Sequence, residues 1–476
     1  MFDFEFDEPT GDGPLDDLVH AYEASLDSPR PRFFDSDDLE LIATHYFEAG
    51  RLEDALAVVD QQIRQLPGSS DPWMRRGILL NHLERHEEAL DAYDEALRYN
   101  PVDAETRINR GITLDTLGHS QEALDDLERA LALDPLSVDG LFNQGIALEK
   151  LERYEEAVAA LERCAEVDPD HPEVWYELGY GYDQLDRLED SVRAYGRQID
   201  IDPFAQNAWY NQGIVLNRLG RYEEAVRAYD FAVAIEDGFT SAWYNRGNAL
   251  ANVSDPQGAA DSYLKVLEYE DGDAATFYNL GLAYDEMGEY PIAVEYFRRA
   301  VDADAEYADA WYGMGCAQDA QALYTEALAS FARALALAPE ESEYWHARAD
   351  TEYNAGSLDE SLRSYTKVVE LDPGNTEAWL DLAETRLEAG LRTEALDAFG
   401  QVVRLDPMSS EAHLRQAWAL ASLGQRENAA RSFRQAAELD PSRADEIRRA
   451  YPDLGSGVVP RGPVSGDGQT QGGERA

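Results

Sequence analysis

The stretch that decides the fold is SDPWMRRGILLNHLERHEEALDAYDEALRYNPVD, residues 70–103. Its apolar residues fall at helical spacing in two runs, which a short turn separates. In each run they share one face of a helix, so the stretch predicts two helices packed against each other. The residues that build these two faces, and the proline that follows them, are Trp73, Gly77, Leu80, Ala89, Tyr93, Ala96 and Pro101.

The same pattern returns every 34 residues, counted from Ser36, without a slip in register. Copies start at positions 36, 70, 104, 138, 172, 206, 240, 274, 308, 342, 376 and 410, and 12 × 34 = 408 residues end at Arg443. Units of this length cannot bury an apolar face alone and must stack on their neighbours. The repeat therefore predicts one elongated domain with a continuous core.

The repeat has an aromatic residue at position 4, Gly at 8, Ala at 20, an aromatic residue at 24, Ala at 27 and Pro at 32. This pattern resembles the tetratricopeptide repeat (TPR), and the resemblance covers 408 of 476 residues. It implies an all-α fold, an α-solenoid in which stacked antiparallel helix pairs form a right-handed superhelix. It also implies that partner proteins bind as extended segments in the concave groove, a step that rests on analogy of fold.

Tryptophan follows the repeat closely, because seven of the eight tryptophans stand at position 4. We expect these rings to pack in the core between the two helices of a repeat and not to stack on a ligand. They are Trp73, Trp175, Trp209, Trp243, Trp311, Trp345 and Trp379.

The ends of the chain are expected to close the stack. Residues 1–35 are an acidic segment with a capping helix over residues 14–27, and residues 444–452 form a second capping helix that stops at Pro452. Residues 453–476, rich in Gly, Pro and Ser, are predicted to be disordered. The apolar face of the first cap is made of Leu15, Leu18, Val19, Tyr22 and Leu26.

The chain is strongly acidic, with 95 Asp and Glu against 40 Lys and Arg, a net charge of −55. Only three of the cations are lysines, and an acid excess with Arg preferred to Lys is typical of organisms that keep molar salt in the cytoplasm. Salt at that concentration screens the self-repulsion. A mesophilic scaffold with a basic partner is the alternative, and nucleic acid is disfavoured in both cases because phosphate binding requires a basic patch.

No pattern for catalysis or a cofactor occurs in the sequence, so we expect no enzyme, cofactor or metal. His82 and His86 are four residues apart but straddle a turn, and Cys164 and Cys316 lie five copies apart, with Cys164 in a core position. The first residues lack the basic and apolar stretches of a signal peptide, and no run is long enough to cross a bilayer. The expected location is the cytoplasm.

Function is expected on the first helix of each repeat, where positions 2, 5, 6, 9, 12 and 13 share the stripe opposite the packing face. Amides recur at position 6 and could pair with the backbone of any extended chain, although Glu177 interrupts them. This row is similar to the asparagine ladder of O-linked N-acetylglucosamine transferases; an ordinary consensus choice explains it as well. The amides are Asn109, Asn143, Asn211, Asn245 and Asn279.

Tyrosine fills position 5 in five consecutive copies, where it offers a broad recognition surface. Packing between adjacent first helices explains this row about as well. The tyrosines are Tyr176, Tyr210, Tyr244, Tyr278 and Tyr312. Acids at positions 2 and 12 flank them and should repel anionic tails, and the carboxylate clamp of the TPR family, with Lys at position 5 and Asn at position 9, has no match.

The sequence therefore predicts a cytoplasmic, non-enzymatic scaffold that binds an extended protein segment of mixed aliphatic and basic character. Two alternatives stay open. One is an arm that recruits substrates for a separately encoded enzyme such as a glycosyltransferase, and the other is an architectural scaffold that assembles with itself.

Overall fold

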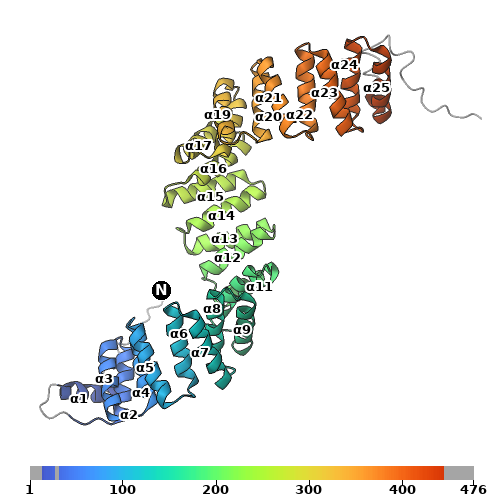
Figure 1. Ribbon diagram of the computed structural model, residues 1–476. Helices are drawn as coiled ribbons and strands as arrows, with labels where there is room; N and C mark the ends of the chain where they lie inside the picture. The colour runs from blue at the N-terminus through green and yellow to red at the C-terminus, as the bar shows by residue number, and fades with distance from the viewer. Residues whose placement is uncertain (1–12, 27–31, 444–476) are drawn as a thin grey trace, which may run out of the picture. The chain divides into compact units, whose positions relative to one another are not determined.

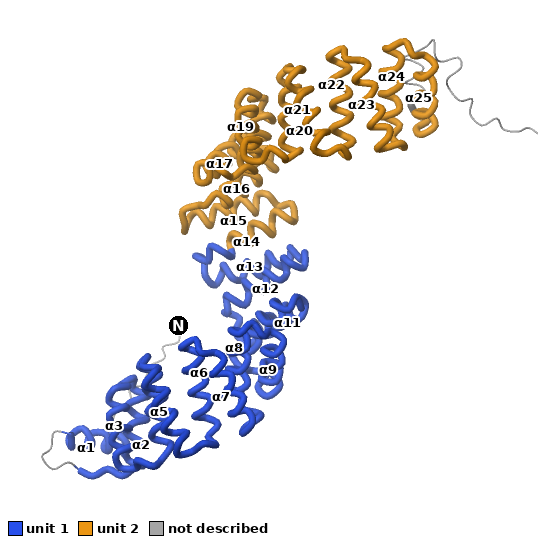
Figure 2. Tube along the Cα trace, in the orientation of Figure 1, with its two compact units in different colours: residues 1–242 blue, residues 243–476 orange. Residues whose placement is uncertain are grey.

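A computed structural model describes residues 13–26 and 32–443, in which twenty-five α-helices and no β-strand occur (Figure 1). The helices form two compact units, residues 1–242 and 243–476 (Figure 2), and the boundary falls inside α14 (Thr240–Asn252). Residues 1–12 and the predicted C-terminal cap and tail, 444–452 and 453–476, lie outside the described residues.

Unit 1 consists of α1 (Pro14–Leu26) and six helix pairs, in which each first helix packs against the second helix that follows it. The first helices are α2 (Ser36–Glu48), α4 (Ser70–His82), α6 (Ala104–Thr116), α8 (Val138–Lys150), α10 (Val174–Gln184) and α12 (Gln206–Arg218). The second helices are α3 (Leu52–Gln65), α5 (His86–Tyr99), α7 (Ser120–Leu133), α9 (Tyr154–Val167), α11 (Leu188–Ile201) and α13 (Tyr222–Ile235).

Unit 2 continues the same pairing from α14 and closes with a short 3-10 turn, Pro441–Arg443. Its further first helices are α16 (Ala274–Glu286), α18 (Ala308–Asp319), α20 (Ser342–Asn354), α22 (Thr376–Glu388) and α24 (Ser410–Ser422). Its second helices are α15 (Pro256–Tyr269), α17 (Tyr290–Ala303), α19 (Tyr324–Leu337), α21 (Leu358–Leu371), α23 (Arg392–Leu405) and α25 (Arg426–Leu439). The all-α, paired architecture predicted from the repeat is confirmed; the domain boundaries stay a prediction.

The two helices of a repeat approach closely because position 8 is small and position 24 is bulky. A Cβ built on Gly213 would lie 2.6 Å from the ring of Tyr229, and one on Gly315 would lie 2.7 Å from the ring of Phe331. The rings themselves are enclosed, since Tyr229 and Phe331 are 0% exposed. Each repeat therefore has a glycine or alanine where a bulky side chain of its own second helix, an aromatic ring in nine of the twelve copies, fills the space.

A left-handed residue at position 15 turns the chain from the first helix to the second in all twelve repeats. Seven copies use glycine, with φ between 71° and 82°. The other five use side-chain residues at φ 56° to 58°, in a region that favours glycine. These five are Glu84, Glu152, Asp186, Ser254 and Ala322.

The tryptophans at position 4 are half-buried, not enclosed in the core as expected from the sequence. In several copies the indole N–H reaches the turn before the repeat, where Trp345 donates to the Pro339 carbonyl at 2.9 Å, whereas the Trp73 Nε1 has no hydrogen-bond partner. Trp175, Trp209, Trp311 and Trp379 make the same bond to the residue at position 32 of the preceding copy, at 2.8 to 3.1 Å. In these five repeats the indole thus ties the first helix to the turn that precedes it.

The helix α1 covers the first repeat only along its middle. Val19 and Tyr22 are buried, and the Tyr22 ring lies 5.4 Å from that of Phe34. The expectation that Leu15 and Leu26 share this contact is wrong, because they are 36% and 65% exposed. Both leucines lie on the predicted face, but they fall at the two ends of α1, beyond its contact with the first repeat.

Substitution of Gly315 by Ala tests the close approach of the helices. The added Cβ meets the Phe331 ring, so we expect a loss of about 1–3 kcal/mol in unfolding free energy, measured by urea denaturation in molar KCl. Gly400→Ala is the matched control, since no atom lies within 4 Å of a Cβ there and helix propensity should give a gain of about 0.5–1 kcal/mol. Equal effects in the two variants would contradict this account.

Substitution of Trp345 by Phe removes the indole N–H and replaces the indole by a smaller phenyl ring, a loss of ring area that the control shares. Trp418→Phe is the control, because Trp418 also lies under an arginine but its buried Nε1 has no hydrogen-bond partner. We expect Trp345→Phe to cost about 1 kcal/mol more than the control in urea unfolding. The indole bond would have no part in stability if both changes cost the same.

Candidate protein-binding surface

The first-helix stripe, defined as positions 2, 5, 6, 9, 12 and 13 of the first helices, carries polar pairs that join consecutive repeats. Along an α-helix, neighbouring residues are about 100° apart, so positions 5 and 6 point to opposite sides of the stripe. Position 5 faces the next repeat and position 6 faces the preceding one. A side chain at position 5 therefore meets position 6 of the next copy, 35 residues later.

Four pairs between position 5 and position 6 of the next copy occur among the described residues. Tyr176 accepts a hydrogen bond from the Asn211 amide at 3.0 Å, and Tyr244 accepts one from Asn279 at 3.0 Å. The other two pairs are Glu40 with Arg75, and His346 with Asp381 at 2.9 Å. The chemistry changes from pair to pair while the 35-residue offset is kept.

Positions 12 and 13 repeat the arrangement two helical turns further on. Lys150 donates to Asp115 at 2.6 Å, and Tyr353 donates to Glu388 at 2.5 Å. Arg218 and Asp183 form the same pair. Some acids that were expected to flank the stripe as free anions are thus neutralised by a cation of the next repeat.

The asparagines at position 6 divide into two groups. Asn211 and Asn279 bind the tyrosine of the preceding repeat, whereas Asn109 and Asn143 donate to the carbonyl four residues earlier in their own helix, at 3.1 and 2.8 Å. Asn245, on α14, is not free either. All five amides are half-buried. In each of the four bonds described above, the asparagine side chain donates an N–H group to a partner within the protein.

The tyrosines at position 5 pack on the ring at position 24 of their own repeat. Ring centroids lie 5.7 Å apart for Tyr176 and Tyr195, and 5.8 Å for Tyr278 and Phe297. Tyr210, Tyr244 and Tyr312 make the same contact at 5.8 to 6.0 Å. Packing therefore fixes the rings, while hydroxyl groups such as that of Tyr176 remain in the stripe as hydrogen-bonding groups.

An apolar hollow of about 190 Å³ lies on the stripe of the first two repeats. Phe47, at position 12, is 38% exposed beside it, and its ring contacts His82 at position 13 of the next copy, 5.1 Å away. The remaining lining is Ala43, Thr44, Val59, Arg75, Ile78 and Leu79. This end of unit 1 offers an apolar surface with one guanidinium beside it.

A pair of acids occupies the stripe where the row of amides is interrupted. Glu177 stands at position 6 of its copy, and Glu149 stands at position 12 of the copy before; both side chains are half-buried. Burial, and next the charge of Glu177, raise the pKa of Glu149 to about 8, while burial and the charge of Glu173 raise the pKa of Glu177. A negative charge on Glu149 is therefore disfavoured in the folded chain.

The raised pKa of Glu149 makes the stability of unit 1 fall as the pH rises between the ordinary value, 4.5, and about 8, because only the folded chain holds the proton there. Glu149→Gln mimics the protonated form. We expect the variant to exceed the wild type in unfolding free energy by about 1–2 kcal/mol above pH 8, after a discount for partial exposure, and to match it in acid.

Thermal unfolding below pH 4.5 and above pH 8 in molar KCl checks this prediction. Glu155→Gln is the control, because Glu155 is exposed on the neighbouring helix α9. A gain in the control equal to that of Glu149→Gln would assign the effect to net charge and contradict the pairing.

Two features of the stripe were missed by the sequence reasoning. The first is the row of inter-repeat pairs, and the second is a cluster of His346, Asp350 and Asp381, whose ligand atoms lie within 4.8 Å of one another. The signal for both was available: positions 5 and 9 share one side of the first helix, and position 6 of the next copy faces them. Comparison of one repeat position at a time does not reveal these pairs, because each pair joins two different positions of consecutive copies.

Models of the tetratricopeptide repeat match most of the chain. The matched ranges are 41–104, 108–172, 144–206, 176–238, 210–275, 278–342, 312–376, 353–418 and 410–443. The chain belongs to the tetratricopeptide repeat family. TPR proteins of this kind are protein-interaction scaffolds in general. In the described part of the chain, no helix has the length and apolar character needed to span a membrane.

Solved structures similar to this TPR chain include MamA from Desulfovibrio magneticus RS-1, which is 24% identical over 36% of this chain and 96% of that one, with a TM-score of 0.34. YrrB, described as a TPR protein with an unusual peptide-binding site, is 21% identical over 39% and 96%, at 0.36. The Cut9–Hcn1 hetero-tetramer of the APC/C is 14% identical over 81% and 90%, at 0.39. The search of curated proteins gave no match.

Proposed function

We propose that this TPR protein is a non-enzymatic scaffold that binds an extended polypeptide segment along the first-helix stripe. The observation that carries the proposal is the row of amide and hydroxyl groups at positions 5 and 6, each fixed by a contact within the protein. The residues proposed to contact the segment are Asn109, Asn143, Asn211, Asn245, Asn279, Tyr176, Tyr210, Tyr244, Tyr278 and Tyr312.

The fixed amides suit recognition of a peptide backbone. An asparagine side chain offers two N–H groups and a carbonyl oxygen, and the bond from Asn211 to Tyr176 uses one N–H. The remaining groups can bind a peptide carbonyl or N–H, and little side-chain entropy is lost because the contact to tyrosine already orients the amide. A row of such groups recognises the backbone of an extended chain with little regard to its sequence.

The negative charge of this protein and its apolar hollow indicate which residues the bound segment should contain. The protein carries a net charge of −55, and acids such as Glu105 and Asp139 at position 2 are exposed beside the amides. Basic residues of a partner are therefore attracted. Aliphatic side chains fit the hollow beside Phe47. The acid excess with few lysines also supports work in a cytoplasm that holds molar salt, where this attraction is short-ranged.

The test is selection from a random peptide library displayed on phage, in molar KCl, followed by fluorescence anisotropy with the selected peptides. We expect peptides with basic and aliphatic residues. Replacement of the five position-6 asparagines by Ala should weaken their binding by about tenfold to a hundredfold, because each lost hydrogen bond contributes on the order of 1 kcal/mol and some are compensated by water.

The matched control replaces amides on second helices, Gln121, Gln257 and Asn428, by Ala. Gln121 and Gln257 are exposed, Asn428 is half-buried, and all three lie outside the stripe, so binding should not change. Equal affinity in the five-asparagine variant and the wild type would refute the proposal. Concentration-dependent sedimentation without peptide binding would favour self-assembly, and peptide selection only in the presence of a copurified catalytic subunit would favour a recruiting arm.

A further inference from the structure

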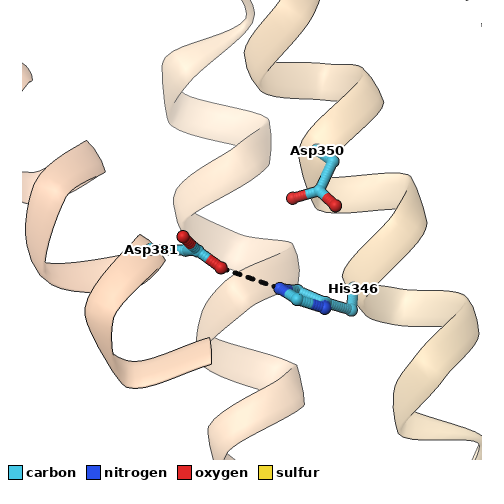
Figure 3. A group of neighbouring side chains, drawn as sticks. All are labelled: His346, Asp350 and Asp381. Carbon is cyan, nitrogen blue, oxygen red and sulfur yellow. Dashed lines mark hydrogen bonds and ion pairs between the residues drawn. The ribbon is translucent and has the colours of Figure 1, made fainter. Parts of the chain in front are cut away.

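A histidine and two aspartates converge on the first-helix stripe of unit 2 (Figure 3). His346 and Asp350 are four residues apart on one face of α20, and Asp381 comes from α22 of the next repeat. The imidazole Nε2 lies 2.9 Å from Asp381 Oδ2, and the ligand atoms of all three side chains lie within 4.8 Å of one another. All three are half-buried, on helices and not on loops.

The same three positions are filled differently in other repeats. Three copies earlier, Tyr244, Asn248 and Asn279 occupy them as neutral groups that hydrogen-bond to one another. One copy later, positions 9 and 6 hold Glu384 and Arg415, an ion pair at 3.2 Å. Around His346, by contrast, two carboxylates share one imidazole, which leaves an excess of negative charge in a half-buried place.

The surroundings orient the carboxylates and add to this excess. Tyr365 donates a hydrogen bond to Asp350, so a buried ring holds that carboxylate toward the cluster. Asp319, on α18 of the preceding repeat, adds a further negative charge, and its Oδ1 is buried without a hydrogen-bond partner.

We propose that His346, Asp350 and Asp381 bind a divalent first-row transition-metal ion such as Zn²⁺. One imidazole nitrogen and two carboxylate oxygens form a ligand set that favours such ions over Mg²⁺ and Ca²⁺, which prefer oxygen alone. Donors at about 2.1 Å from a metal lie up to about 4.2 Å apart, so a small rotation of one carboxylate closes the set. The ion bridges α20 and α22 and leaves coordination positions open on the stripe.

The test uses the full chain, freed of metal and held in molar KCl, with Zn²⁺ or Co²⁺ as the probe. Calorimetry should give one tight Zn²⁺ site per chain, Co²⁺ should develop visible absorption from nitrogen and oxygen ligands, and Zn²⁺ should raise the thermal midpoint. None of these readouts requires a peptide partner, so failure of this test leaves the proposed function untouched.

The decisive variant combines His346→Tyr, Asp350→Asn and Asp381→Asn, because it recreates the group of Tyr244, Asn248 and Asn279 that the chain already folds. It should lose the tight site and the Co²⁺ absorption. The control, Glu149→Gln with Glu177→Gln, removes a carboxyl pair from the stripe of unit 1 and should keep both. Equal Zn²⁺ affinity in the wild type and the triple variant, or equal losses in both variants, would overturn the proposal and leave His346 and Asp381 as an ion pair.

Discussion

The close approach of the two helices in every repeat is the constraint on which the rest of this structure depends. A glycine or alanine at position 8 gives room to the ring at position 24, as Gly213 does for Tyr229. A single hairpin cannot cover these rings, because they also need the first helix of the next copy. The hairpins must therefore stack, and the tryptophan bond to the preceding turn adds a directional tie to the apolar contact.

Stacking at a constant 34-residue interval places the first helices side by side in one register. From this register follow the pairs between positions 5 and 6 and between positions 12 and 13, always 35 residues apart. The same geometry accepts a guanidinium with a carboxylate, a tyrosine with an amide, or an imidazole with a carboxylate. Within each unit the stripe therefore keeps one geometry while its chemistry varies from copy to copy.

The chain has a large excess of acidic residues, and some of these acids form ion pairs with nearby arginines. Arginine at position 16 pairs with an acid at position 19 in the turns of several repeats, as in Arg85 with Glu88 and Arg221 with Glu224, but exposed pairs of this kind contribute little each. Acids are less well compensated on the stripe, where burial and the charge of Glu177 raise the pKa of Glu149 and where two aspartates lie beside His346. Uncompensated acids that are half-buried persist more readily at surfaces that bind something than in positions serving packing alone.

The sequence by itself determined the period, the helix hairpins, the small residues against rings and the family, because these follow from apolar spacing within one repeat of 34 residues. Only the tertiary structure decided which stripe residues meet. Asn211 and Asn109 occupy the same repeat position, yet one binds the preceding tyrosine and the other its own helix. The hydrogen-bond partner of each asparagine depends on the residue at position 5 of the preceding copy and on the rotation between adjacent first helices. A one-dimensional pattern does not contain that rotation, and the clusters at Glu149 and His346 each join residues from two adjacent repeats.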